Sequence, residues 1–284
     1  MRIGNRRFGH KAFPLRNAGL RGAGKIRLII ALAVGGFALL SYCSSASYNP
    51  VTGEKQYLSM TPSQEIAMGL QAVEQMAARH GGLHPDPRLQ EFLDSVCWQI
   101  IRNSQAAETQ WQFECHLLSD ASVVNAFALP GGQMFITYAL FRQLETEGQL
   151  AGVMAHEIGH VVARHSAQRM AKSQLTQGII QAVIMGTESG GMGQMAGMVG
   201  NMVNMQYGRE DELESDSIGV MLMAQSGYDP NALKGVMKIL AAASQGRSAP
   251  EFFSTHPNPE NRIEKIDKAI QSQFPEGLPN NLKP

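Results

Sequence analysis

The chain has 284 residues, of which 44% are hydrophobic and 17% charged; this composition fits one globular domain, or two, and excludes collagen-like, disordered and disulfide-dense proteins. Positive charge concentrates at the start, because eight of the 24 Lys and Arg residues fall in residues 1–27 and no acidic residue precedes Glu54. The rest of the chain carries 16 basic against 24 acidic side chains. Such an acidic body repels phosphate backbones, so we expect no nucleic-acid partner.

Residues 1–43 are predicted to be a leader that brings the chain to a membrane. The apolar run from Leu28 to Leu40 is shorter than the roughly 20 residues of a bilayer span but fits the apolar core of a secretory signal. Three fates stay open, namely lipidation of Cys43, cleavage after Ala46, or an uncleaved anchor. We expect a membrane-tethered body exported to a bacterial periplasm. The alternative is the mitochondrial intermembrane space, because mitochondrial presequences are also rich in Arg.

Beyond the leader, residues 44–275 are predicted to form a single domain with a tail at residues 276–284. The first helix is expected to begin near Thr61, as the capping residue, with Pro62 at the first helical position. A second helix is indicated by apolar residues spaced by three and four, namely Leu89, Phe92, Leu93, Val96 and Ile100.

Two strands are expected next, at 111–117, where residues alternate with a period of two, and at 134–138, after a Pro-Gly-Gly turn. A long helix is then predicted from Thr146, which forms a capping box with Gln149, to about Ser173. Further helices are expected at about 210–225, 231–244 and 260–272. Because helices dominate and strands are few, the predicted fold class is α+β.

The long helix contains His156-Glu157-Ile158-Gly159-His160. Residues four apart lie one turn apart on the same helix face, so both imidazoles can reach one metal ion. Glu157 is placed beside them, where a carboxylate can take a proton from water on the metal. The motif therefore predicts a zinc site on this helix.

A third protein ligand is expected from an acidic segment about 50 residues later. Glu212 and Asp216 would share one face of a helix there, and so would Glu210 and Glu214, so the spacing alone does not choose between the two pairs. Gly159 lets a neighbouring element approach the metal-binding helix closely, because it carries no side chain.

These motifs together resemble peptidase family M48, the zinc metallopeptidases that include HtpX, BepA, LoiP, the CAAX prenyl proteases and the mitochondrial Oma-type enzymes. The resemblance spans residues 48–270 and rests on HExxH, on Glu-x-Glu-Ser-Asp ending at Asp216, on residues 125–132, and on the segment 254–257 with Arg262. It implies a compact single-domain member with a zincin-like (gluzincin) fold. That fold is mostly helical, with a small sheet whose edge strand precedes the HExxH helix.

The resemblance also implies the ligand set. One Zn²⁺ per chain would be held by His156, His160 and Glu212, with Asp216 hydrogen-bonding a ligand imidazole. Glu210 and Glu214 would then belong to a solvated helix face.

Catalysis would use Glu157 as the general base, which returns its proton to the leaving nitrogen. The tetrahedral oxyanion needs a further positive or hydrogen-bonding group, for which His256, Arg262, Tyr207 and Arg209 are candidates. His256 is also a candidate for a fourth zinc ligand that closes the site.

Substrate is expected to lie extended against the strand at 127–129, or at 134–137, and to add its backbone as another strand. The candidate contacts are Asn125, Ala126, Phe127 and Gly131. Recognition of main chain suits unfolded or membrane-associated proteins, so the expected role is quality control of envelope proteins by a zinc-dependent endopeptidase. The alternatives are a narrow-specificity processing protease, or an autoinhibited, chaperone-like binding protein with a closed zinc site.

Three other features bear on the fold. His165 would lie about 180° round the long helix from His156, so we expect a surface or packing role.

Cys97 and Cys115 would form one disulfide in an exported protein, or stay as two buried thiols. A run of methionines spaced by three and four is predicted to be a core stripe, with a mobile cover over the site or a membrane-facing helix as the alternative; it comprises Met192, Met195, Met198, Met202 and Met205.

Overall fold

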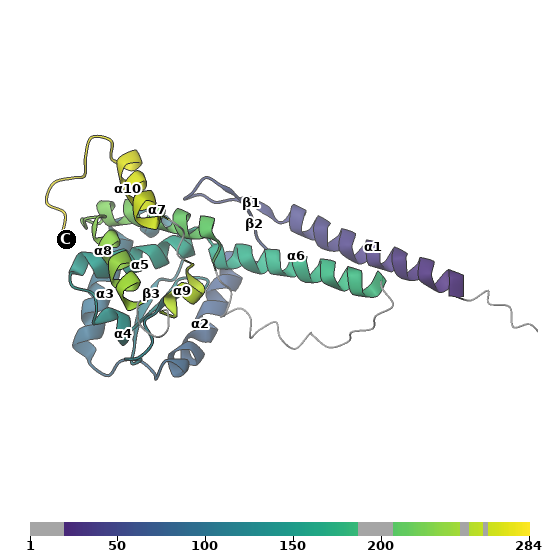
Figure 1. The fold of residues 1–284 in the computed structure, drawn as a ribbon, viewed down its shortest axis with the longest axis horizontal. Coiled ribbons are helices and arrows are strands. Elements are labelled where there is room, and N and C mark those ends of the chain that lie inside the picture. Colours follow the sequence, from purple (N-terminus) through teal and green to yellow (C-terminus); the bar gives the residue numbers. More distant parts are fainter. Residues whose placement is uncertain (1–19, 187–206, 245–249, 258–260) are drawn as a thin grey trace, which may run out of the picture.

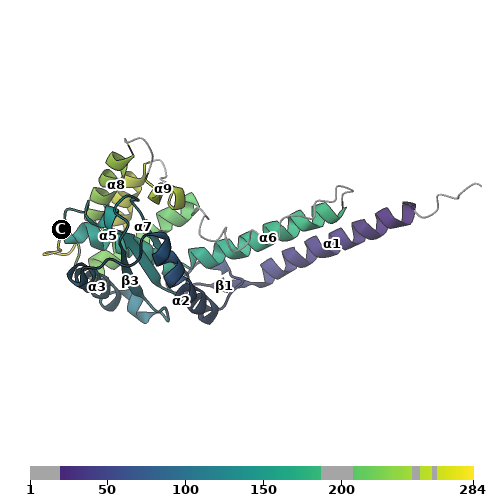
Figure 2. The same cartoon turned by 90° about the horizontal axis from the view of Figure 1, so that it is seen from below.

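The computed structural model describes residues 20–186, 207–244, 250–257 and 261–284. Within these ranges the chain forms a helical body around a small sheet, from which an arm of two long helices projects (Figure 1, Figure 2). The predicted α+β class is confirmed. The five methionines of the predicted stripe lie outside the described residues.

The arm consists of α1 (Leu20–Ser44) and α6 (His165–Gly186), which lie side by side and run in opposite directions (Figure 1, Figure 2). Within α1, the 21 residues Gly24–Ser44 are long and apolar enough to cross a membrane, by length and composition alone. The helix is therefore longer than the apolar run at 28–40, since it begins at Leu20 within the basic segment and continues through residues 41–44.

A small hairpin connects the arm to the body. Its strands β1 (Ala46–Tyr48) and β2 (Lys55–Tyr57) are antiparallel, and a turn at residues 49–53 joins them. The Asn49 side chain fixes this turn, because its Oδ1 accepts a hydrogen bond from the Val51 N–H at 2.8 Å.

The first body helix begins where its capping residue predicts. α2 (Pro62–Arg79) has the complete capping box at Thr61 and Gln64. α3 (Pro87–Arg102) buries one stripe of five residues, which are Leu93, Val96, Cys97, Ile100 and Ile101. Phe92 was expected in this stripe but lies at its margin and is 42% exposed, because Cys97 and Ile101 shift the buried face away from it.

The main sheet has the order β3-β5-β4, formed by β3 (Glu114–Leu118), β4 (Ala126–Ala128) and β5 (Gln133–Thr137). The central strand β5 is parallel to β3 and antiparallel to β4. The expectation that residues 134–137 accept a substrate strand is therefore wrong, because both edges of β5 are already paired. The edge strand β4 precedes the HExxH helix in the chain, with β5 between them.

A disulfide joins α3 to this sheet. It links Cys97 to Cys115 of β3, so the disulfide, and not the pair of free thiols, is the alternative that the structure shows. Residues 111–113 were expected to open the strand but lie before it.

The HExxH motif lies on α5 (Glu147–Val162), which is preceded by the short helix α4 (Tyr138–Phe141). Thr146 caps α5 as predicted, and its hydroxyl accepts a hydrogen bond from the Gln149 N–H at 3.2 Å. The predicted capping box is incomplete, because Gln149 Oε1 accepts from the Glu145 N–H at 2.7 Å and not from Thr146. Every residue from Gly148 to Val162 is buried, so α5 is the central helix of the body.

The helix predicted to run to Ser173 is in fact two helices. α5 ends at Val162, and Arg164 has a φ of 57°, in the left-handed region that breaks a helix. α6 begins at His165 in a new direction. No glycine or proline marks this break in the sequence.

Helices complete the C-terminal half of the chain, namely α7 (Arg209–Gln225), α8 (Ala232–Ala243), α9 (Phe252–Thr255) and α10 (Arg262–Gln273). The last nine residues, predicted to be a tail, return to the start of the central helix, where the Gly148 N–H donates to the Pro284 carbonyl at 2.9 Å.

Candidate metal centre

The site is built where α5 and α7 approach each other closely. A Cβ on Gly159 would stand 2.6 Å from Ser215 Oγ, so only glycine fits at this point. Ser215 donates its hydroxyl proton to the backbone carbonyl of His156. The predicted close approach at Gly159 is thus present, and it turns the face of α7 that bears Glu212 and Asp216 toward the two histidines.

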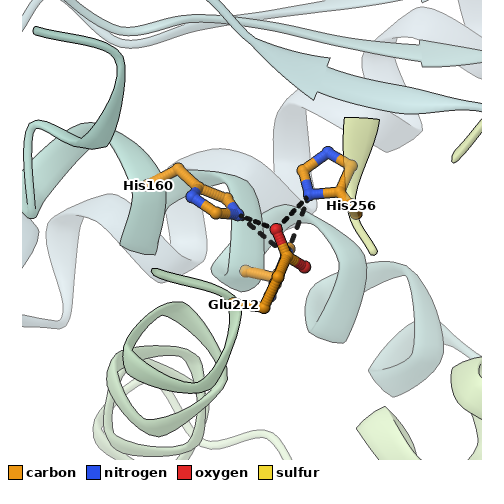
Figure 3. Close-up of side chains that lie close together, drawn as sticks. His160, Glu212 and His256 are labelled. Atoms are coloured by element: carbon orange, nitrogen blue, oxygen red, sulfur yellow. Dashed lines mark hydrogen bonds and ion pairs between the residues drawn. The ribbon is translucent and has the colours of Figure 1, made fainter. Parts of the chain in front are cut away.

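Four buried side chains converge there, from three different elements. The ligand atoms of His156, His160, Glu212 and His256 all lie within 4.8 Å of one another. His256 follows α9, and Figure 3 shows it facing Glu212 with His160 on the other side. The predicted residues of the metal site are therefore brought together, and His256 joins them.

The separations of these atoms suit a tetrahedral ion. His160 Nε2 lies 3.0 Å from His156 Nε2 and 3.4 Å from Glu212 Oε1. His256 Nδ1 lies 3.1 Å from Glu212 Oε1 and 3.4 Å from His156 Nε2. Zinc–nitrogen bonds of about 2.0–2.1 Å place tetrahedral ligand atoms about 3.3 Å apart, so the donor set fits zinc.

The charges of the cluster also fit a divalent cation. Three buried carboxyl groups, those of Glu157, Glu212 and Asp216, face one buried guanidinium of the described residues, that of Arg262. When all three carboxyl groups are ionised, Arg262 compensates one negative charge and two remain. Several buried polar atoms in this cluster have no hydrogen-bond partner among the described residues. They include both carboxylate oxygens of Glu157 and the Oε2 atom of Glu212. Buried charges of this kind are paired or coordinate metals.

The neighbouring groups set the protonation of the cluster. Burial by itself would raise the pKa values of Glu212 and Asp216, but imidazoles around Glu212 and Arg262 beside Asp216 hold both pKa values below their usual range. Burial raises the pKa of Glu157, so this carboxylate binds a proton more readily than an exposed glutamate does.

The imidazole of His156 is oriented by a carboxylate, as the resemblance implies. Its Nδ1 lies 2.9 Å from Asp216 Oδ1. An ionised carboxylate only accepts hydrogen bonds, so Nδ1 carries the proton and Nε2 directs its lone pair into the cluster.

Arg262 lies behind this pair and makes a bidentate contact with the same carboxylate. Its Nε and Nη2 donate to Asp216 at 2.7 and 2.8 Å. Such fork-shaped pairs fix the position of a carboxylate strongly. The geometry thus supports a positioning role for Arg262 through Asp216. Its Nη1 also lies 3.3 Å from Glu212 Oε2, and the oxyanion role stays a prediction.

The other two oxyanion candidates differ in position. The ring of Tyr207 stacks on His160 with centroids 3.9 Å apart, and its hydroxyl lies 2.9 Å from Ser166 Oγ. Arg209 is exposed at the start of α7. Tyr207 therefore belongs to the wall of the site, and Arg209 does not.

The expected position of His165 is wrong, and Glu214 is only 25% exposed and does not belong to a fully solvated face. His165 is 1% exposed, its Nδ1 lies 2.8 Å from His160 Nδ1, and its Nε2 lies 3.0 Å from Glu214 Oε2. The break at Arg164 explains the difference, because it returns the chain toward α5 and places His165 beside the ligand instead of on the far side of a continuous helix.

These contacts fix the tautomer of His160. Glu214 accepts the Nε2 proton of His165, which leaves the Nδ1 of His165 as an acceptor for the Nδ1 proton of His160. The Nε2 of His160 then directs its lone pair toward His156 and Glu212. The chain Glu214–His165–His160 thus prepares the second histidine as Asp216 prepares the first.

A groove of about 690 Å³ runs beside the cluster along the edge strand β4. Asn125 and Phe127, two of the predicted substrate contacts, line it, and so does Tyr207. Gly131 does not, because it packs on the backbone of α2, where a Cβ would stand 2.4 Å from Ile66 Cα. Its φ of 85° assigns it to the turn instead.

The outer edge of β4 carries backbone groups that β5 does not pair, and the two residues that bear them, Ala126 and Ala128, are 0% and 8% exposed. The Leu129 N–H donates to the Gln133 carbonyl across the ladder. Because hydrogen-bonded pairs alternate along an antiparallel ladder, the N–H and C=O groups of Ala126 and Ala128 point away from β5.

Comparison with known proteins agrees with the metal site described above. Residues 86–270 match the family model of Peptidase family M48. The chain is 32% identical over 247 residues to the beta-barrel assembly-enhancing protease of Escherichia coli K12, covering 83% of this chain and 50% of that protein. It is 32% identical over 234 residues to the mitochondrial metalloendopeptidase OMA1 of Schizosaccharomyces pombe, covering 80% and 67%. The chain thus spans about half the length of the bacterial relative.

The contact between His165 and His160 predicts an effect on metal affinity. His165→Phe keeps a ring in the buried position but removes the acceptor for the Nδ1 proton of His160. We expect zinc affinity, measured by competition with a chelator, to fall about 10- to 100-fold.

A matched control is His116→Phe, which removes a different buried imidazole, bonded to Gln133 and remote from the cluster. Equal zinc affinities in the two variants would show that His165 does not position the ligand.

Proposed function

The chain belongs to peptidase family M48, a family of zinc-dependent metallopeptidases, and from this premise we propose that it is an endopeptidase whose zinc ligands are His156, His160 and Glu212. The convergence of these three buried side chains on one point, with their donor atoms within reach of a single ion, is the observation that carries the proposal.

Zinc bound there supplies a Lewis acid that polarises a peptide carbonyl and lowers the pKa of water toward about 7. Glu157 follows a ligand directly on α5 and has both carboxylate oxygens free of hydrogen bonds to the described residues. It accepts the proton of the attacking water and delivers it to the leaving nitrogen.

The substrate lies extended along β4 and pairs its main chain with the outward N–H and C=O groups of Ala128, which lines the groove. Ala126 is fully buried, so pairing at that residue requires the elements that cover it to move. Main-chain pairing requires an unfolded or locally extended segment, since a folded one has its backbone groups already paired. Half of the residues that line the groove beside this edge are apolar, and they include Met68, Met76 and Met170. Methionine packs adaptably, so the groove accepts apolar side chains of varied shape.

We place the enzyme at a membrane facing the periplasm, where it removes unfolded or membrane-associated proteins. The apolar helix α1 supports the tether, and its end bears the exposed basic residues Lys25 and Arg27, which stay on the cytoplasmic side of a membrane by the positive-inside rule. The name of the bacterial relative refers to β-barrel assembly, which supports an envelope role. A narrow-specificity processing protease is the alternative within the same chemistry.

One observation favours a second candidate function, an autoinhibited or chaperone-like binding protein. His256 is fully buried, and its Nδ1 lies 3.1 Å from Glu212 Oε1, which is the place of a fourth ligand. In this arrangement His256 occupies the position that water and substrate need, so turnover requires α9 to move.

Replacing the base tests the endopeptidase directly. Glu157→Gln keeps the size and the ligands but removes the group that takes the proton, so casein cleavage should fall by at least about 100-fold. Zinc content per chain should stay unchanged. Glu114→Gln, at an exposed acidic position of β3, is the control and should cleave as the parent does.

Full cleavage by the Glu157→Gln protein with zinc retained would contradict the mechanism. A parent protein that holds zinc, binds casein stoichiometrically and never cleaves it would favour the second candidate function.

Proline at the open edge tests the substrate position. Ala128→Pro removes an N–H that the sheet does not use, so the ladder stays intact. The loss of one hydrogen bond to substrate should lower kcat/KM for casein about three- to tenfold. Ala128→Ser retains the N–H and should match the parent. If both variants cleave like the parent, substrate does not pair with β4.

A further inference from the structure

We propose that the outer half of α6, residues 178–186, enters the lipid bilayer beside α1, so that the two helices form one membrane-inserted hairpin. The proposal rests on the membrane tether by α1 given above, and it adds a second segment, 140 residues away in the sequence, to the membrane-bound surface.

The two helices pack with small residues at their contact. A Cβ on Gly178 would stand 2.5 Å from Ala38 Cβ, and one on Gly35 would stand 3.3 Å from Ala182 Cβ. Four positions with glycine or alanine thus bring the helix backbones close together. Small residues at the interface are typical of helix pairs in membranes, where van der Waals packing between backbones replaces the hydrophobic effect.

Both helices change from polar to apolar at the same level. The Gly178–Ala38 contact fixes which residues lie side by side, since the helices run in opposite directions (Figure 1, Figure 2). Toward the body, α6 has the mostly polar stretch 172–177, and α1 has Ser41, Tyr42, Cys43 and Ser44. Beyond this level, Gln181 is the only polar side chain between Gly178 and Met185, and α1 is uncharged back to Arg27.

The apolar side chains of the arm are exposed. On α6, Ile179, Ile180, Val183 and Met185 are 43–59% exposed. Eight large apolar residues of α1 are exposed as well, and they are Ile26, Leu28, Ile29, Ile30, Leu32, Phe37, Leu39 and Leu40. Exposing such a surface to water is unfavourable by roughly 25 cal/mol per Å².

The distribution of these side chains favours hydrocarbon over a protein partner. Successive residues of a helix point about 100° apart, so Leu28, Ile29 and Ile30 together face more than half of the circumference of α1. A second copy of the chain would cover one face of the arm. A bilayer surrounds the arm and covers the exposed apolar side chains on every face.

Insertion of α6 also places the substrate groove near the membrane. The first turns of the same helix line that groove, with Ser166, Arg169 and Met170. Met170 and Gly178 are eight residues apart, which is about 12 Å along a helix. The groove therefore opens close to the lipid surface, where it meets extended segments of proteins that emerge from the bilayer.

The full-length chain with Cys43→Ser, reconstituted in phosphatidylcholine–phosphatidylglycerol vesicles, provides the test. An environment-sensitive fluorophore is attached to one new cysteine at a time, at Val183 on α6, Leu32 on α1, or Lys172 on α6. Each position is exposed in the protein. Lipids with a nitroxide at the middle of the acyl chain should quench the labels at Val183 and Leu32 at least about twofold. The label at Lys172, on the polar side of the transition, should respond only to a headgroup nitroxide.

Quenching at Leu32 without quenching at Val183 would overturn the insertion of α6 while leaving the tether by α1 intact. Absence of quenching at both positions would overturn the tether as well. A blue-shifted Val183 label that no nitroxide lipid quenches, and whose emission depends on protein concentration, would show that a second copy covers the arm and would also overturn the proposal.

Discussion

The site depends on the close approach of α5 and α7. Gly159 allows this approach, because any side chain there would collide with Ser215. Two helices that meet this closely leave no room for water between them, so the polar side chains on their facing surfaces must pair with one another or with an ion. The contact between α5 and α7 therefore also places buried polar groups where a metal ion can pair with them.

The imidazoles are prepared for that metal by two chains of contacts that end in acidic groups. Asp216, held by Arg262, orients His156. On the other side, His165 contacts Glu214 through its Nε2 and His160 through its Nδ1. In both, the proton is held on Nδ1 and the lone pair of Nε2 faces the cluster. The two sets of contacts hold both rings in the orientation that the ion needs.

The parts of the site that local spacing determines could be predicted from the sequence. The two histidines of HExxH lie on one helix face, and Thr146 caps that helix. Gly159 indicates that another element packs closely against the helix. The role of His165 could not be predicted, because the break at Arg164 comes from a single φ angle that no glycine or proline signals. The sheet order has a similar cause, since strand periodicity does not reveal which strand lies in the centre. The family resemblance supplied the choice of Glu212, which spacing left open.

The central claim is that His156, His160 and Glu212 hold one zinc ion. Anomalous diffraction at the zinc absorption edge, from crystals of the zinc-loaded protein, tests it most directly. The account predicts one peak per chain, about 2.0–2.1 Å from the Nε2 atoms of both histidines and about 2.0–2.2 Å from the Glu212 carboxylate. A zinc peak bound elsewhere on the chain, with this cluster empty, would contradict the account.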